Sequence, residues 1–202
     1  ALKAAATRIS AGRTYRLWVN GQLVARGPDD AGSDVGETGR WTHQWLYNTV
    51  DLAPYLHPGS NVVAVEVVNV SSSSAFSLGK TGLAFDAELT YSDGRRTVMA
   101  GPEGWTATTT QAYSDGPLSA LRASEGLRYD ASLEPADWRR SSGWHDWAAA
   151  VPIDSVWGVL HASHIPTRIE AVWPATRPSD NHDITTRGDS TFTIHFGRVI
   201  SA

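Results

Sequence analysis

Residues 15–25 read YRLWVNGQLVA, and this stretch decides the fold. Tyr15, Leu17 and Val19 alternate with residues of the opposite face, which is typical of a half-buried strand. A second short apolar run follows Asn20-Gly21. Asn-Gly between two such runs is the strongest short signal for a β-hairpin, because both turn residues must adopt positive φ. The stretch therefore predicts two antiparallel strands joined by a tight turn.

The pattern of short strands separated by turn residues continues on the C-terminal side of this hairpin. Residues 62–68 are β-branched on both faces, which suits a central strand. Asp93-Gly94 predicts a second hairpin. Further strands are predicted at residues 41–47, 83–91, 95–100, 165–173 and 192–196, with short helical turns at 51–56 and 118–124. Short strands at close spacing predict an all-β fold, a jelly-roll or galactose-binding-like β-sandwich with short helical turns.

The composition excludes several classes of protein. With 202 residues, 41% of them apolar and 19% charged, the chain is a folded domain rather than a disordered tail. The net charge of −4 without a basic stripe excludes a nucleic-acid partner, and no apolar run reaches the roughly 20 residues that span a membrane. The absence of cysteine excludes disulfides and thiolate catalysis but leaves the compartment open. Nine tryptophans against six tyrosines and four phenylalanines suggest contact with carbohydrate.

Four stretches in a fixed order carry a family resemblance. They are Tyr15–Pro28 with its Val-Asn-Gly turn, Tyr47–Val62, Glu125–Glu134 and Phe192–Val199. Together they resemble the N-terminal β-sandwich region of bacterial α-L-rhamnosidases, which are large multidomain glycoside hydrolases. Two departures stand out: the loop after Pro28 is longer and more acidic than is usual in that family, and the usual ending after the third stretch, Glu125–Glu134, is altered at Trp144–Trp147.

The resemblance implies a domain organisation and a role. A β-sandwich that lacks the family's first strand is expected over residues 1–173, followed by a connector and the first strand of a next β domain over 174–202. The family's catalytic carboxylates lie in a C-terminal α/α-barrel. The expected function is therefore non-catalytic: carbohydrate binding or cleft shaping for rhamnose-containing glycans or glycosides, with the rest of a larger catalytic chain as partner. The alternatives are a purely structural domain that docks the barrel, and an autonomous glycan-active enzyme.

An acidic loop is the candidate metal site. Asp29, Asp30, Asp34 and Glu37 lie close together in a glycine-rich loop. Calcium takes six to eight hard oxygen ligands, so these carboxylates predict a possible calcium site, although their spacing is not that of an EF-hand. The alternative is a solvated loop in which aspartate and glycine serve turns.

The aromatic stretch after this loop is the candidate sugar site. Trp41, His43 and Trp45, with Asn48 beside them, predict a platform on which the C–H faces of a sugar stack while polar groups bind its hydroxyls. The alternative is that the alternating aromatic residues form one core face of the sandwich.

Other chemistry-bearing residues are interpreted structurally. Trp138 and the cluster Trp144–Trp147, which includes His145 and Asp146, are expected to pack rather than to catalyse. Asp130 and Glu134 could form a glycosidase pair, but the resembling box is non-catalytic in the family. His161 and His164 have no third partner at ligand spacing and are expected at the surface.

Overall fold

The computed structural model describes most of the first 165 residues: 1–12, 14–28, 33–35, 41–43, 45–68, 82–118, 125–141, 146–153 and 159–165. The chain divides into two units, Ala1–His164 and Ile165–Ala202. The fold below is that of the first unit. The boundary predicted at residues 173–174, and the strands predicted at 165–173 and 192–196, lie beyond the described residues.

The elements of the described part are almost all strands. They are β1 (Leu2–Ala11), β2 (Thr14–Val19), β3 (Gln22–Gly27), β4 (Ser33–Val35), β5 (Trp41–His43), β6 (Trp45–Asp51), β7 (Val63–Val68), β8 (Leu83–Tyr91), β9 (Arg96–Ala100), β10 (Thr106–Ala107), β11 (Tyr113–Leu118), β12 (Glu125–Tyr129), β13 (Ala148–Ala149) and β14 (Leu160–Ala162), with the 3₁₀ turns η1 (Ala53–Tyr55) and η2 (Ala131–Leu133). None of the described helices is long and apolar enough to cross a membrane.

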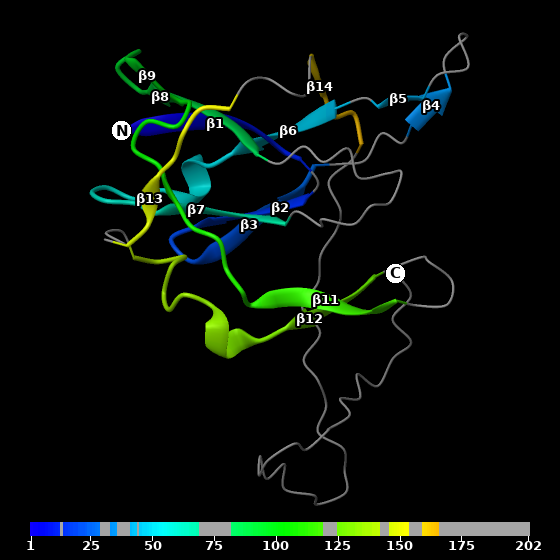
Figure 1. Cartoon of the computed structure of the whole chain (residues 1–202). Coiled ribbons are helices and arrows are strands. Elements are labelled where there is room, and N and C mark those ends of the chain that lie inside the picture. Colours follow the sequence, from blue (N-terminus) through cyan, green and yellow to red (C-terminus); the bar gives the residue numbers. More distant parts are fainter. Residues whose placement is uncertain are drawn as a thin grey trace, which may run out of the picture. The chain divides into compact units, whose positions relative to one another are not determined.

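The larger sheet has the strand order β14-β6-β1-β8-β9 (Figure 1). Its middle strand, β1, pairs antiparallel with both β6 and β8. The sequence analysis did not predict this strand, because its alanines are strong helix formers and few of its residues are large and apolar. Ala5, Thr7, Ile9 and Ala11 are nonetheless fully buried at every second position, so the period of two is carried by small side chains.

The second sheet has the order β3-β2-β7 and contains the predicted hairpin. The prediction is confirmed: Asn20 and Gly21 have φ values of 52° and 81° between paired β2 and β3. The second predicted hairpin is also confirmed, with β8 paired to β9 across a turn at Gly94, φ 85°. The prediction of a central position for residues 62–68 is wrong, because β7 lies at the end of this sheet among the described strands.

The core lies between these two sheets. Tyr15, Leu17 and Val19 of β2 are at most 1% exposed and pack with Ile9 of β1 and the 3₁₀ turn residue Leu52. A polar contact joins the two sheets here, because the Tyr15 hydroxyl donates to the Asn48 side-chain oxygen of β6 at 2.9 Å. The structure thus confirms the all-β sandwich, and Figure 1 shows the two sheets as separate layers. The helical turn predicted at 51–56 is confirmed as η1, whereas Leu118, the first residue of the predicted turn at 118–124, ends strand β11.

The turn residue Asn20 links the hairpin to the next part of the chain. Its side-chain amide donates to the carbonyl oxygen of Tyr55 at 3.0 Å and to the Asn61 side chain at 2.9 Å. Its oxygen accepts from the backbone N–H of Val62 at 2.9 Å. One residue therefore holds the β2–β3 turn, η1 and the start of β7 together.

We predict that Asn20→Gly lowers the free energy of unfolding by about 1–3 kcal/mol, because it removes these hydrogen bonds but tolerates the left-handed backbone. Asn20→Ala should cost about 1 kcal/mol more, since alanine is strained at positive φ. Urea unfolding followed by tryptophan fluorescence measures both values. Equal stability of the two variants would show that backbone strain at residue 20 is unimportant.

Candidate functional site

Strand β6 places the predicted sugar platform on the outer face of the larger sheet. Leu46 is 3% exposed and points into the core, so its neighbours Trp45 and Tyr47 point to the opposite face, where both are half-buried. The alternative that these aromatic residues form a core face is therefore wrong for β6. Trp41 and His43 lie in β5, and their side chains are outside the described part of the structure.

Asn48, predicted to act beside Trp45, lies on the other face of β6. Its oxygen accepts the Tyr15 hydrogen bond, and a Cβ placed on Gly27 would come within 2.3 Å of that oxygen. The Asn48 side chain is thus enclosed between the two sheets. The structure does not bring Trp45 and Asn48 together on one surface.

The predicted calcium ligands lie mostly outside the described residues. This holds for Asp29, Asp30 and Glu37, and for the side chain of Asp34. The backbone of Asp34 belongs to β4, which pairs antiparallel with β5 so that Asp34 lies opposite Thr42. The acidic loop and the aromatic stretch are therefore joined in one hairpin. Among the described residues, no group of three His, Asp or Glu side chains is placed to hold a metal, and the calcium site stays a prediction.

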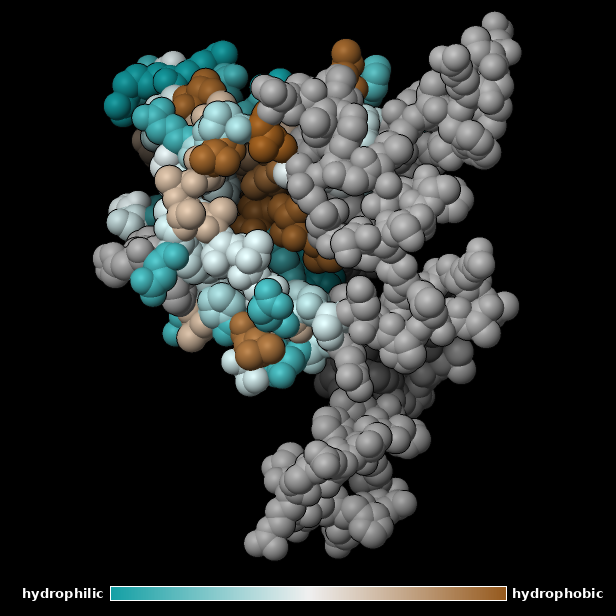
Figure 2. Space-filling view, in the orientation of Figure 1, coloured by the Kyte–Doolittle hydropathy of each residue, from teal (hydrophilic) through white to brown (hydrophobic). Residues whose placement is uncertain are grey.

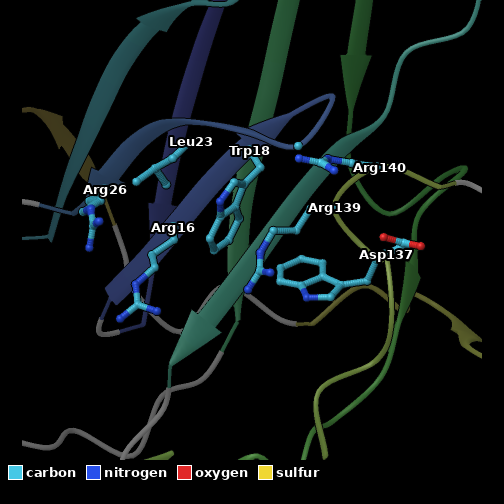
Figure 3. Close-up of a pocket in the computed structure, with 9 residues that line it drawn as sticks. Arg16, Trp18, Leu23, Arg26, Asp137, Arg139 and Arg140 are labelled. Atoms are coloured by element: carbon cyan, nitrogen blue, oxygen red, sulfur yellow. The ribbon is translucent and has the colours of Figure 1, made fainter. Parts of the chain in front are cut away.

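A pocket that the sequence analysis missed lies on the outer face of the smaller sheet (Figure 3). Its volume is about 710 Å³. Strands β2 and β3 form one wall, and the turn after η2 forms the other. The lining residues are Arg16, Trp18, Gly21, Leu23, Arg26, Asp137, Trp138, Arg139 and Arg140.

The centre of this pocket is an arginine that packs against two tryptophans. The Arg139 guanidinium carbon lies 4.7 Å from the ring centroids of both Trp18 and Trp138. The two indoles meet edge to face at 5.1 Å. Trp138 therefore packs, as its structural interpretation predicted. The Arg139 Nε–H is buried without a hydrogen-bond partner among the described residues, and an unmet donor of this kind costs about 1–3 kcal/mol.

Glu134 holds Trp138 and Arg139 in place through hydrogen bonds. Its carboxylate accepts hydrogen bonds from the Tyr129 hydroxyl, from Trp138 Nε1 at 2.9 Å and from Arg139 Nη2. Burial by itself raises the pKa of Glu134, but the Tyr129 and Trp138 hydrogen bonds and the Arg139 charge outweigh it and hold the pKa below its ordinary 4.5. Glu134 is therefore a structural anion that orients three side chains.

Asp130 has a structural role as well. Its carboxylate accepts from the Ser132 hydroxyl at 2.6 Å and from the Ser132 backbone N–H at 2.9 Å, and so caps η2. These bonds lower the pKa of Asp130. A glycosidase acid needs a raised pKa, so neither Asp130 nor Glu134 is suited to protonate a leaving group.

The turn that carries Arg139 and Arg140 has a local cause. Asp137 adopts a left-handed φ of 52°, which aspartate tolerates better than most residues, and its carbonyl oxygen accepts from the N–H groups of Arg140 and Ser141. The Arg140 side chain then passes over the hairpin turn, where a Cβ on Gly21 would lie 2.5 Å from Arg140 Cγ. Glycine at residue 21 is favoured by its positive φ, and a side chain there would also displace Arg140.

The remaining candidates show no assembled site. His161 in β14 and His164 are exposed, as expected. Trp144 and His145 lie outside the described residues, whereas Asp146 is exposed and Trp147 is half-buried.

Comparison with known proteins identifies the family of this chain. Residues 1–170 match the family described as alpha-L-rhamnosidase N-terminal domain. The chain belongs to this family. No curated protein matches the chain.

Three solved rhamnosidases contain a similar fold. The one from Bacillus sp. GL1, assigned to family GH78, is 26% identical over 83% of this chain with a TM-score of 0.62. The Streptomyces avermitilis enzyme, complexed with L-rhamnose, is 26% identical over 73% of the chain with a TM-score of 0.52. The Dictyoglumus thermophilum enzyme is 20% identical over 82% of the chain with a TM-score of 0.63, which shows the fold alone.

The chain matches only a small part of each of these α-L-rhamnosidases. The matched share is 17% of the Bacillus protein, 14% of the Streptomyces protein and 18% of the Dictyoglumus protein. The family resemblance seen in the sequence is confirmed.

We predict that Glu134→Gln lowers the free energy of unfolding at pH 7 by about 1.5–3 kcal/mol, because the Arg139 charge loses its partner. Because the pKa of Glu134 is lowered on folding, its stabilisation is present above pH 4.5 and is lost as the pH falls through the folded value. The difference between wild type and variant should therefore shrink toward pH 3. Urea unfolding at pH 7 and pH 3 measures it.

The matched control is Glu88→Gln, which removes an exposed ion pair with Arg96. It should change the free energy of unfolding by less than about 1 kcal/mol. A Glu134 variant that is as stable as this control would contradict the structural role of Glu134.

Proposed function

We propose that this domain is the non-catalytic, carbohydrate-binding N-terminal sandwich of an α-L-rhamnosidase-type glycoside hydrolase that acts on rhamnose-containing glycans or glycosides. The match of residues 1–170 to the N-terminal-domain family carries the proposal. The L-rhamnose bound by the Streptomyces relative supports this class of sugar. The structural use of Asp130 and Glu134 supports a non-catalytic role.

The outer face of β6 is the proposed contact surface for rhamnose. Trp45 lies on the face of β6 that points away from the core, and its indole is the proposed stacking surface for the sugar. Trp41 and His43 in the neighbouring β5, and calcium on Asp29, Asp30, Asp34 and Glu37, complete the proposed site.

We predict that Trp45→Ala weakens rhamnoside binding by at least tenfold, which corresponds to about 1.4 kcal/mol. The reason is the loss of the stacking surface. Calorimetric titration of the 202-residue chain with rhamnose and methyl rhamnoside measures it, both with added calcium and with a chelator.

The control variant is Trp105→Ala, which removes an indole that packs on Phe85 at 5.0 Å. It should bind the sugars like the wild type, although its unfolding temperature is expected to fall. Absence of any rhamnoside binding by the wild-type chain, with or without calcium, would refute the carbohydrate-binding function.

A specific observation favours a second candidate, a structural domain that docks the catalytic part of a larger chain. Val151, Ile153 and Val159 are 73%, 53% and 74% exposed, and we propose that they contact the catalytic part. Hydrophobic residues also gather on the face of the described part that Figure 2 shows.

Docking predicts that a paired Val151→Ser and Ile153→Ser variant lowers the unfolding temperature of a full-length rhamnosidase carrying this domain. The same change should leave the unfolding temperature of the 202-residue chain unaltered, because both side chains are exposed in it. Equal effects in the two proteins would exclude these residues from a docking surface.

A further inference from the structure

The turn at Asn20-Gly21 combines a reactive pair of residues with a rigid setting. An asparagine followed by glycine loses its side-chain amide readily, because glycine has no Cβ to keep its backbone nitrogen away from the asparagine Cγ. Of the five asparagines in the chain, only Asn20 is followed by glycine. Deamidation therefore has one favoured position in this sequence.

The reaction needs only water and proceeds through a cyclic imide. The Gly21 nitrogen gives up its proton and bonds to Asn20 Cγ, and the Cγ–Nδ2 bond breaks as Nδ2 takes up a proton and leaves as ammonia. Water then opens the five-membered ring. Hydrolysis at Cγ gives aspartate at residue 20, whereas hydrolysis at the backbone carbonyl carbon gives isoaspartate, in which the main chain runs through Cγ.

In the folded domain the Asn20 amide is held by hydrogen bonds. Its Nδ2 donates to the Tyr55 carbonyl oxygen at 3.0 Å and to Asn61 Oδ1 at 2.9 Å. Its Oδ1 accepts from the Val62 N–H at 2.9 Å, and the Asn20 N–H donates to the Val62 carbonyl oxygen at 2.8 Å. Closing the imide ring would turn the amide toward Gly21 and break its bonds to these partners.

The backbone of the turn is held as well. Asn20 and Gly21 have φ values of 52° and 81°, and the flanking residues Val19 and Gln22 are paired between β2 and β3. Arg140 lies over Gly21, so closely that a Cβ there would come within 2.5 Å of the arginine Cγ. Rotation of the Asn20–Gly21 peptide to close the ring would displace Arg140 or disturb the pairing of the two strands.

The products of the reaction do not fit this site. A carboxylate has no N–H to donate, so its oxygen would face the Tyr55 carbonyl oxygen and Asn61 Oδ1. Turning the Asn61 amide over to compensate would lose its own bonds, because its Oδ1 accepts from the His57 N–H at 3.0 Å and its Nδ2 donates to the His57 and Gly59 carbonyl oxygens at 2.8 and 3.1 Å. Isoaspartate adds a main-chain carbon to a two-residue turn and so disturbs the register of β2 and β3.

We propose that Asn20 is a deamidation site that the native hydrogen bonds keep closed and that reacts when the turn or the whole domain unfolds. Conversion then prevents the turn, η1 and the start of β7 from joining again, so a chain that has reacted is lost from the folded population. The inference is independent of sugar binding, because it depends on the turn and its partners alone.

The test compares the deamidation rate of Asn20 in the folded and in the unfolded 202-residue chain. The chain is incubated at pH 8 in buffer and in concentrated guanidinium chloride, and the peptide that contains Asn20 is followed by mass spectrometry as a gain of one mass unit. The rate in buffer should be at least tenfold lower. In guanidinium chloride, Gly21→Ala should lower the rate at least tenfold, because a Cβ hinders the attacking nitrogen.

Asn61→Ala separates the local hydrogen bonds from overall stability, because it removes an acceptor of the Asn20 amide. Trp105→Ala is the matched control, since it removes an indole that packs on β8. Small additions of guanidinium chloride bring the two variants to the same free energy of unfolding. At that point Asn61→Ala should deamidate at least fivefold faster. Should Asn61→Ala not fold, Arg140→Ala takes its place with an expected threefold rise, because it uncovers Gly21.

Refolding tests the consequence of the reaction. A chain fully deamidated at Asn20 in guanidinium chloride should regain native fluorescence on dilution to less than one fifth of the extent seen for a chain diluted at once. Asn20→Asp should unfold at a lower denaturant concentration than Asn20→Gly, which lacks the same hydrogen bonds but adds no charge.

Three results would each overturn the proposal: equal deamidation rates in buffer and in denaturant, equal rates in the turn variant and the Trp105 control at matched stability, or full refolding of the deamidated chain. An Asn20→Asp variant as stable as Asn20→Gly would also contradict it. Slow deamidation in buffer, together with failed refolding after deamidation, supports it.

Discussion

The rest of the structure depends on the alternation of side chains along β2. Tyr15, Leu17 and Val19 face the core, whereas Arg16 and Trp18 face the pocket. Because the period of a strand is two, a slip of one residue would put Arg16 into the core and Leu17 into the pocket. The left-handed turn at Asn20-Gly21 sets this register, and the Asn20 hydrogen bonds hold it. One short strand thus specifies both the sandwich and its charged outer surface.

The two faces of β2 are covered by different kinds of contact. The core face is apolar, and the Tyr15–Asn48 hydrogen bond adds a directional contact between the sheets. The outer face is closed by a polar assembly in which Trp18, Trp138 and Arg139 stack around a charge that Glu134 neutralises. A stacked guanidinium needs its carboxylate, because an unpaired buried charge is costly. The Glu125–Glu134 box that carries part of the family resemblance therefore has a structural reason for its last residue.

Features that depend on neighbouring residues could be predicted from the sequence, whereas features that depend on contacts between distant residues could not. Both hairpins depend on neighbouring residues, so Asn20-Gly21 and Asp93-Gly94 predict them. The family could be recognised from short motifs in a fixed order. Strand β1 was missed because its buried positions hold alanine and threonine, whose pattern is hidden among good helix formers. The arginine pocket was missed because Trp18 and Arg139 meet only when the turn at Asp137 folds over β2. The separation of Asn48 from Trp45 could have been predicted, because residues three positions apart in a strand point to opposite faces.

Asp130 and Glu134 both hold the local structure around η2. A glycosidase acid must keep its proton near neutral pH, yet Glu134 and Asp130 are hydrogen-bonded in ways that favour the ionised form. The Glu134 carboxylate is committed to Arg139, and the Asp130 carboxylate is committed to η2. In this arrangement neither residue is suited to act as the general acid of a glycosidase.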